Sequence, residues 1–219
     1  MKVLLLADTK YRDSFANLLR SAPGIELVDS KPDVIVDAAF LSPYAKIAAL
    51  QALVEKAPIV TNTLTVSATS VRAALDNAAE VVGLSVFPNY IDRQKTVEYS
   101  LPFGISKASA PFSQLLDALD KSGEEIKDTI GGVFPRTLAM IVNEATFAVQ
   151  ESVATAADID TAMKLGTNYP KGPLAWCDEI GADAIVAVLD ALAKEYGPER
   201  YRVATLLRRY AESGLKFLD

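Results

Sequence analysis

The run Lys2-Val-Leu-Leu-Leu-Ala7 decides the fold class of this chain. Such a short apolar run, without alternating polar residues, is typical of a strand that is buried on both faces of a parallel sheet. A helical pattern follows through Phe15, Leu18 and Leu19, and Ser21-Ala-Pro-Gly24 supplies the turn residues that end it. The sequence therefore predicts a strand, a helix and a turn at its start.

Apolar runs alternate with helical segments through the first half of the chain. Strands are predicted at residues 25–29, 33–38, 59–61, 81–87, 96–101 and 125–129. Helices are predicted at residues 44–56 and, after Pro111, at residues 112–119. Because alternating strands and helices imply right-handed crossovers, we expect an α/β fold with a parallel-dominated sheet.

Beyond Gly131-Gly132 the pattern is helical. Helices are predicted at residues 136–151, 156–165, 182–196 and 204–213. Thr155 stands three residues before Asp158, as an N-cap residue would, and Gly214 stands where a C-cap residue would. We therefore expect two domains, residues 1–130 and residues 131–219, with no Ser/Gly-rich linker between them.

The composition excludes several classes of protein. Half of the 219 residues are apolar, which is enough to bury a full core. The 22 basic and 28 acidic residues give a net charge of −6, and the basic residues are scattered, so we expect no nucleic-acid partner. No apolar stretch approaches the ~20 residues of a membrane span, and the N-terminus lacks a small-residue cleavage site. We expect a soluble, cytoplasmic protein.

Histidine is absent, and Cys177 is the single cysteine. An internal disulfide is therefore excluded, and a zinc site of the usual nitrogen and sulfur ligands cannot be built, so no metal is expected. The thiol is expected to be partly buried beside Trp176.

The turn after the first strand lacks the glycines of a dinucleotide site. Such a turn needs glycine because the backbone must approach a pyrophosphate, which sits at the helix N-terminus. Here Ala7, Thr9 and Arg12 stand at the three glycine positions, and Asp8 adds a negative charge. Asp29 stands where an acidic side chain would bind a ribose diol, although an aspartate that simply ends a strand explains it as well.

The most distinctive motifs lie in the second half of the chain. They are Asn143-Glu-Ala145, Val153 to Gly166, Asn168-Tyr-Pro-Lys-Gly-Pro-Leu-Ala-Trp176, and Tyr201 to Phe217. These segments resemble the helical C-terminal domain of 3-hydroxyacyl-CoA dehydrogenases. They most resemble the second half of duplicated members of the phenylacetate-degradation type, in which the first half carries catalysis. The resemblance implies a truncated Rossmann-like parallel sheet followed by an all-helical 3-hydroxyacyl-CoA dehydrogenase C-terminal domain.

A weaker resemblance covers residues 1–105. Asp33-Val-Ile-Val-Asp-Ala-Ala39 resembles the strand before the acyl-site helix of that family. Thr61-Asn62-Thr63 resembles the start of its Asn-Thr-Ser-Ser turn, and Gly83-Leu84 resembles the residues that lead to its catalytic histidine. The family's catalytic positions can therefore be located along this chain.

The resemblance implies four such positions. The family uses a serine that binds the substrate oxygen, a histidine that moves the proton, a glutamate that orients the histidine, and an asparagine that holds the set. These positions fall on Leu64, Ser85, Glu98 and Pro135, so only the glutamate is retained. A hydroxyl without a base cannot replace imidazole as a general base, so Ser85 and Glu98 are weak catalytic candidates.

The resemblance also implies a substrate-binding set. Asn62, and the loop residues Tyr169, Pro170, Gly172 and Pro173, would lie near the acyl site, and the helices around this loop would form a homodimer interface. A rigid turn made by prolines and glycine explains the loop without any ligand.

Three functions are compatible with these residues. The first is a 3-hydroxyacyl-CoA dehydrogenase-like protein of fatty or aromatic acyl-CoA degradation without dehydrogenase activity, which forms a homodimer, uses no cofactor, and binds an acyl-CoA or a partner dehydrogenase. The alternative is an active NAD-dependent dehydrogenase, or a CoA-thioester enzyme, rebuilt around Glu98 and Ser85. The third is an interaction protein without a ligand. Losing a general base commonly costs about 10²–10⁴-fold in rate, which favours the first.

One structural feature separates these functions. A pocket lined by Leu64, Ser85, Glu98 and Tyr169 would favour a ligand, whereas side chains that fill this space would favour an interaction protein.

Overall fold

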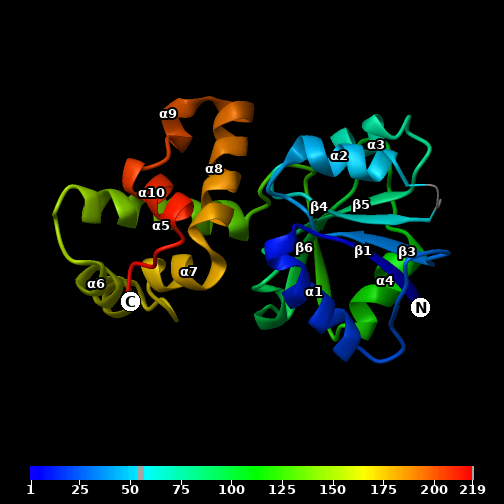
Figure 1. Ribbon diagram of the computed structural model, residues 1–219, viewed down its shortest axis with the longest axis horizontal. Coiled ribbons are helices and arrows are strands. Elements are labelled where there is room, and N and C mark those ends of the chain that lie inside the picture. Colours follow the sequence, from blue (N-terminus) through cyan, green and yellow to red (C-terminus); the bar gives the residue numbers. More distant parts are fainter. Residues whose placement is uncertain (54–56, 219) are drawn as a thin grey trace. The chain divides into compact units, whose positions relative to one another are not determined.

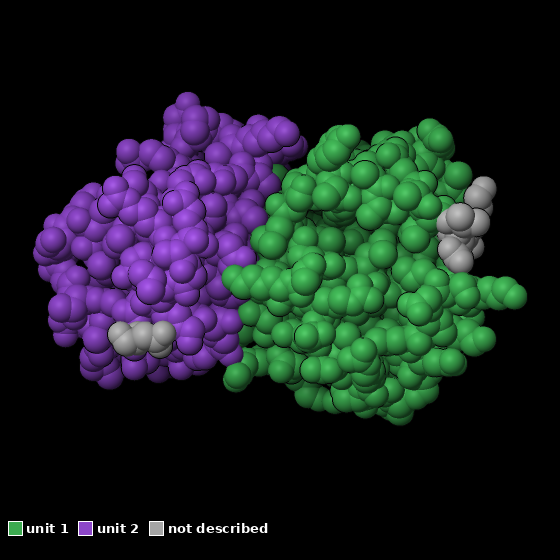
Figure 2. Space-filling model, viewed as in Figure 1, with its two compact units in different colours: residues 1–133 green, residues 134–219 purple. Residues whose placement is uncertain are grey.

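The computed structural model describes residues 1–53 and 57–218. The chain divides into two compact units, Met1–Val133 and Phe134–Asp219, which are coloured separately in Figure 2. This division lies close to the boundary expected near residue 130. The predicted helix at residues 44–56 ends at Gln51, and residues 54–56 lie outside the described residues.

Unit 1 is built on a seven-stranded sheet of order β2-β1-β3-β4-β5-β6-β7. The strands are β1 (Lys2–Leu6), β2 (Glu26–Leu27), β3 (Val34–Asp37), β4 (Ile59–Asn62), β5 (Val81–Ser85), β6 (Thr96–Ser100) and β7 (Ser122–Ile126). All neighbouring strands pair in parallel except β5 and β6, which are antiparallel. The predicted α/β class with a parallel-dominated sheet is confirmed.

Helices cover both faces of this sheet (Figure 1). They are α1 (Thr9–Ser21), α2 (Pro43–Gln51), α3 (Ala68–Ala74), α4 (Ala110–Ala118) and a 3-10 turn, η1 (Ile91–Arg93). Val3 and Leu5 of β1 belong to the core that contains α1 and α4, whereas Leu4 belongs to the core that contains α2 and α3. Because successive strand residues point to opposite faces, one apolar run supplies both cores.

Unit 2 is helical. Its helices are α5 (Phe134–Gln150), α6 (Ala156–Thr167), α7 (Pro173–Ile180), α8 (Ala182–Tyr196), α9 (Pro198–Tyr201) and α10 (Thr205–Ser213). The amide of Asn143 on α5 donates to the carbonyl of Arg202 over 3.0 Å and accepts from the backbone N–H of Ala204 over 2.8 Å, which fixes the segment before α10. In the described part of the chain, no helix is long and apolar enough to cross a membrane.

Several sequence expectations for local structure are confirmed, and others are wrong. Thr155 caps α6 by accepting from the N–H of Asp158, and Gly214 ends α10 in a left-handed conformation, as predicted. The last strand covers residues 122–126 rather than 125–129, because it is an exposed edge strand without an apolar pattern. The prediction that Asp29 closes β2 is also wrong, since β2 ends at Leu27.

Several short helices are not predicted by the apolar pattern of the sequence. Three of them, α3, α7 and α9, have 7, 8 and 4 residues, too few for a helical repeat to stand out. The expectation for the thiol is also corrected. Cys177 on α7 is fully buried rather than partly buried, and burial raises the pKa of its thiol well above the usual range.

A buried ion pair joins β3, α2 and β4. The ammonium group of Lys46 lies 2.9 Å from the Asp37 carboxylate, and both side chains are buried. It also donates to the carbonyls of Ala39 and Asn62, at 2.9 and 2.5 Å, while Asp37 accepts from the hydroxyl of Thr61 over 2.7 Å. Burial lowers the pKa of Lys46, and the attraction of Asp37 opposes this shift. The pair fixes the carboxyl ends of two central strands.

We expect Lys46→Met to destabilise unit 1 by about 3–5 kcal/mol, because it leaves the Asp37 carboxylate buried without its cation. The double variant Asp37→Asn/Lys46→Met removes that uncompensated charge, and should recover about 2 kcal/mol relative to the single variant. Denaturant unfolding followed by circular dichroism measures both. The single variant Asp37→Asn completes the comparison. If the losses in unfolding free energy of the two single variants add up to that of the double variant, the pair is not coupled.

In unit 2, a buried carboxylate holds the start of α7. Asp160 of α6 accepts from the backbone N–H groups of Leu174 and Ala175 over 2.8 and 2.9 Å. Gly172 packs so closely on this carboxylate that a Cβ atom there would overlap it. The first turn of a helix leaves N–H groups without a helical partner, and Asp160 satisfies two of them.

Asp160→Ala should destabilise the protein by about 1–3 kcal/mol, because it leaves two amides of α7 without their acceptor. Thr161→Ala is the matched control, since Thr161 is the next residue of α6 and is exposed, and it should change stability by less than about 0.5 kcal/mol. The midpoints of urea unfolding compare the two. Equal midpoints would contradict a capping role for Asp160.

Candidate functional site

The turn after β4 carries the first of the predicted site residues. Asn62 is buried, its amide nitrogen donates to the carbonyl of Val86 over 2.7 Å, and its amide oxygen accepts from the N–H of Leu64 over 2.9 Å. Leu64, at the position expected to bind a substrate oxygen, is fully buried and offers no polar group. In this structure Asn62 therefore fixes the turn on β5.

Ser85 ends β5 and is also buried. Its hydroxyl lies 2.7 Å from the hydroxyl of Thr63, and only 1% of its surface is exposed. A hydroxyl paired with another hydroxyl is not activated as a nucleophile or as a base, because neither group takes up its proton near neutral pH. No sequence motif indicates Thr63 as the partner of Ser85.

Glu98 lies opposite Ser85 in the antiparallel pairing of β5 and β6. Its carboxylate accepts from the backbone N–H of Val133 over 2.6 Å, and the N–H of Gly131 donates to the carbonyl of Thr63 over 2.9 Å. These two bonds hold the turn at residues 131–133 against the end of β4 and the middle of β6. A structural contact therefore accounts for the retained glutamate.

Gly132 closes the space above Ser85 and Glu98. A Cβ atom at this position would lie 2.5 Å from the Glu98 carboxylate and 2.5 Å from the Cβ of Ser85, and its φ of +56° is rarely adopted by other residues. Ser85 and Glu98 are thus brought together, as the resemblance implies, but backbone packs directly on them. The adjacent glycines 131 and 132 were the sequence signal for this close approach.

Two open cavities of unit 1 lie elsewhere. One of about 630 Å³ is lined by apolar residues of α2, α3 and the start of β4, including Leu50, Leu53 and Leu75. A second, of about 870 Å³, lies between the end of α3 and residues 105–117. Both are at the opposite ends of the parallel strands from Ser85. Neither cavity is lined by Leu64, Ser85 or Glu98.

The turn after β1 does not present a dinucleotide site. Asp8 turns its carboxylate towards the loop after β3, where it accepts from the N–H groups of Phe40 and Leu41 over 2.8 and 3.1 Å. The guanidinium of Arg12 on α1 donates to the carbonyl of Leu5, so the side chain packs back on the preceding strand, β1. Asp29 is exposed in a bend beyond β2. The turn lacks the glycine-lined approach that a pyrophosphate requires.

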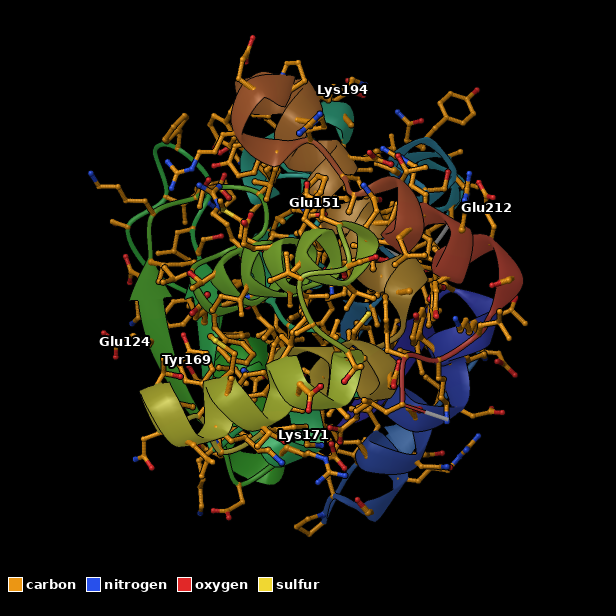
Figure 3. All side chains as sticks on the ribbon, turned by 90° about the vertical axis from the view of Figure 1, so that its left-hand side faces the viewer. Glu124, Glu151, Tyr169, Lys171, Lys194 and Glu212 are labelled. Atoms are coloured by element: carbon orange, nitrogen blue, oxygen red, sulfur yellow. The ribbon has the colours of Figure 1, made fainter. Side chains whose placement is uncertain are left out.

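The predicted substrate loop of unit 2 is the connection from α6 to α7, labelled by Tyr169 and Lys171 in Figure 3. The ring of Tyr169 lies 5.8 Å from that of Trp176, and Lys171 pairs with Glu179. Pro173 is buried in the first turn of α7, Gly172 rests on Asp160, and Pro170 is exposed. The loop's prolines and glycine are thus accounted for by the start of a helix.

One further predicted position, and a search for metal ligands, offer little chemistry. Pro135, at the asparagine position, is buried in the first turn of α5 and has no side-chain hydrogen-bonding group. Across residues 1–53 and 57–218, no three histidine, cysteine, aspartate or glutamate side chains are grouped as metal ligands would be. Among the described residues, Glu98 is the one family catalytic residue that is retained, and its carboxylate accepts from the N–H of Val133 in the turn at residues 131–133.

The sequence matches known proteins over part of its length. Residues 131–216 match the family model described as "3-hydroxyacyl-CoA dehydrogenase, C-terminal domain". The "3-hydroxyadipyl-CoA dehydrogenase" of Escherichia coli (strain K12) is 52% identical over 92 residues, which cover 41% of this chain and 19% of that protein. The "Probable 3-hydroxybutyryl-CoA dehydrogenase" of Bacillus subtilis (strain 168) is 34% identical over 157 residues, which cover 71% of this chain and 54% of that protein. The chain spans about half the length of the Bacillus relative.

The fold is shared with a solved structure. The crystal structure of (S)-3-hydroxybutyryl-CoA dehydrogenase from Ralstonia eutropha matches with a TM-score of 0.76 and 23% sequence identity, covering 99% of this chain and 95% of that chain. At this identity the likeness concerns the fold. The chain therefore carries, at residues 131–216, the C-terminal domain of the 3-hydroxyacyl-CoA dehydrogenase family.

Proposed function

We propose that this chain is a 3-hydroxyacyl-CoA dehydrogenase-like protein of fatty or aromatic acyl-CoA degradation that lacks dehydrogenase activity. It acts as a dimerising or acyl-CoA-binding module and works beside a catalytically complete dehydrogenase. The observation that carries this proposal is that the polar groups at the catalytic position are already hydrogen-bonded within the fold. The hydroxyl of Ser85 is buried against Thr63, and Glu98 is bound to the turn at residues 131–133.

The chemistry of the family supports the proposal. Reduction of a 3-ketoacyl thioester requires a group that delivers a proton near neutral pH, and imidazole supplies this in enzymes of the family. Ser85 has no such capacity, and Leu64 leaves the substrate oxygen without a donor. Since the losses of base and oxygen-binding group multiply, the family mechanism would retain negligible rate.

The wild-type protein at micromolar concentration should not oxidise NADH with acetoacetyl-CoA above the rate without protein, because the proton-transfer group alone commonly contributes about 10²–10⁴-fold. NADH absorbance measures this. A turnover that Glu98→Gln abolishes would instead establish an active, rebuilt site. The matched control is Glu124→Gln, because Glu124 is the exposed partner of Glu98 on β7 and is labelled in Figure 3.

A surface of unit 2 supports the homodimer. The helix α6 is rich in alanine and also contains Ile159, Met163 and Leu165, yet its one buried residue is Asp160. Leu165 is 83% exposed and nearby Val153 is 72% exposed. Figure 3 shows α6 on the face of unit 2 turned towards the viewer. A solvent-exposed helix of this composition gains by burial against a second copy of itself.

We expect the wild-type protein to be a dimer, and Leu165→Glu to make it monomeric at micromolar concentration, because a buried unpaired charge is costly at an apolar interface. Light scattering after size-exclusion chromatography gives the mass. Leu215→Glu serves as control, since Leu215 is also exposed but lies outside α6. A wild-type monomer, or a dimer that survives Leu165→Glu, would exclude this interface.

A further inference from the structure

The sheet of unit 1 has a switch point between β1 and β3. The chain passes from β1 outwards to β2, and then crosses to β3 on the other side of β1. In open α/β sheets, ligands bind in the crevice outside the carboxyl ends of the strands at such a point. The loops that follow β1 and β3 therefore border the place where a dinucleotide would lie.

In this chain the two loops are bonded to each other. The carboxylate of Asp8, directly after β1, accepts from two adjacent backbone N–H groups of the loop after β3, those of Phe40 and Leu41, over 2.8 and 3.1 Å. Paired main-chain N–H groups of this kind are a common seat for an anion in proteins. Here the anion belongs to the chain itself.

Further contacts of Phe40 hold the loop after β3 in place. Its side chain is fully buried, its ring lies 5.3 Å from the ring of Tyr11 on α1, and its carbonyl accepts from the hydroxyl of Thr65 over 2.6 Å. Lys46 also donates to this loop, at the carbonyl of Ala39. The loop after β3 is thus fixed to α1, to α2 and to the turn after β4.

We propose that the chain itself permanently closes the dinucleotide crevice of unit 1, with the Asp8 carboxylate seated on the N–H groups of Phe40 and Leu41 and the Phe40 ring packed against Tyr11. This goes beyond the proposed function, because a relative without activity could still hold its nucleotide. The N–H groups of Phe40 and Leu41 are hydrogen-bonded without NAD, because Asp8 supplies their acceptor.

Hydrogen exchange resolved to single amides tests the contact. The N–H groups of Phe40 and Leu41 should exchange slowly in the wild-type protein and about tenfold or more faster in Asp8→Ala, because their acceptor is lost. Asp8→Asn keeps one acceptor oxygen, so it should lie between the two, and it provides the measurement if Asp8→Ala does not fold. Asp13→Ala, an exposed aspartate on α1, is the matched control and should leave both amides slow.

Nucleotide binding tests the closure. NAD, NADH and ADP at millimolar concentration should leave the melting temperature of the wild-type protein unchanged within about 1 °C, whereas a ligand at about 100 times its Kd would raise it by several degrees. NADH fluorescence should show no saturable binding. Saturable binding of NADH, or protection of the Phe40 and Leu41 amides that does not depend on Asp8, would overturn the inference. Either result is independent of the acetoacetyl-CoA assay and of the dimer.

Discussion

The structure depends on aspartate carboxylates that each accept from two adjacent backbone N–H groups. Asp8, Asp128, Asp160 and Asp178 bind the amide pairs of residues 40–41, 68–69, 174–175 and 217–218. Buried or partly buried amides at helix starts and loop turns are costly when they lack an acceptor. In each case the acceptor comes from a residue at least 14 positions away, so the contact also fixes tertiary structure.

The same contacts bear on the proposed separation of the family's architecture from its chemistry in this chain. A relative that binds ligands must leave some amides and hydroxyls open at the carboxyl ends of its strands. Here Asp8 and Asp128 accept hydrogen bonds from backbone amides. The Ser85 hydroxyl is hydrogen-bonded to Thr63, and the Glu98 carboxylate accepts from the turn at residues 131–133. Each of these polar groups is therefore used within the fold.

Much of the fold could be predicted from the sequence, because buried strands such as residues 2–6 and long amphipathic helices such as α5 and α8 leave a clear apolar pattern. The bounds of the exposed edge strand β7 could not be predicted correctly, since its sequence, Ser-Gly-Glu-Glu-Ile, has no such pattern. The positions of the candidate site were also readable from local motifs. Their contacts were not, because the partners of Ser85, Glu98 and Asp8 lie 22 to 35 residues away.

The burial of Cys177 gives unit 2 a built-in reporter of its own opening. Thiol reagents attack the thiolate, and a group that is fully enclosed, with a raised pKa, offers neither access nor charge while α7 is in place. Modification then requires the helices around it to part, so its rate follows the population of opened molecules. Because the sequence contains no second cysteine, the rate of thiol modification reports on opening at one position of the helical domain, without labels or substitutions.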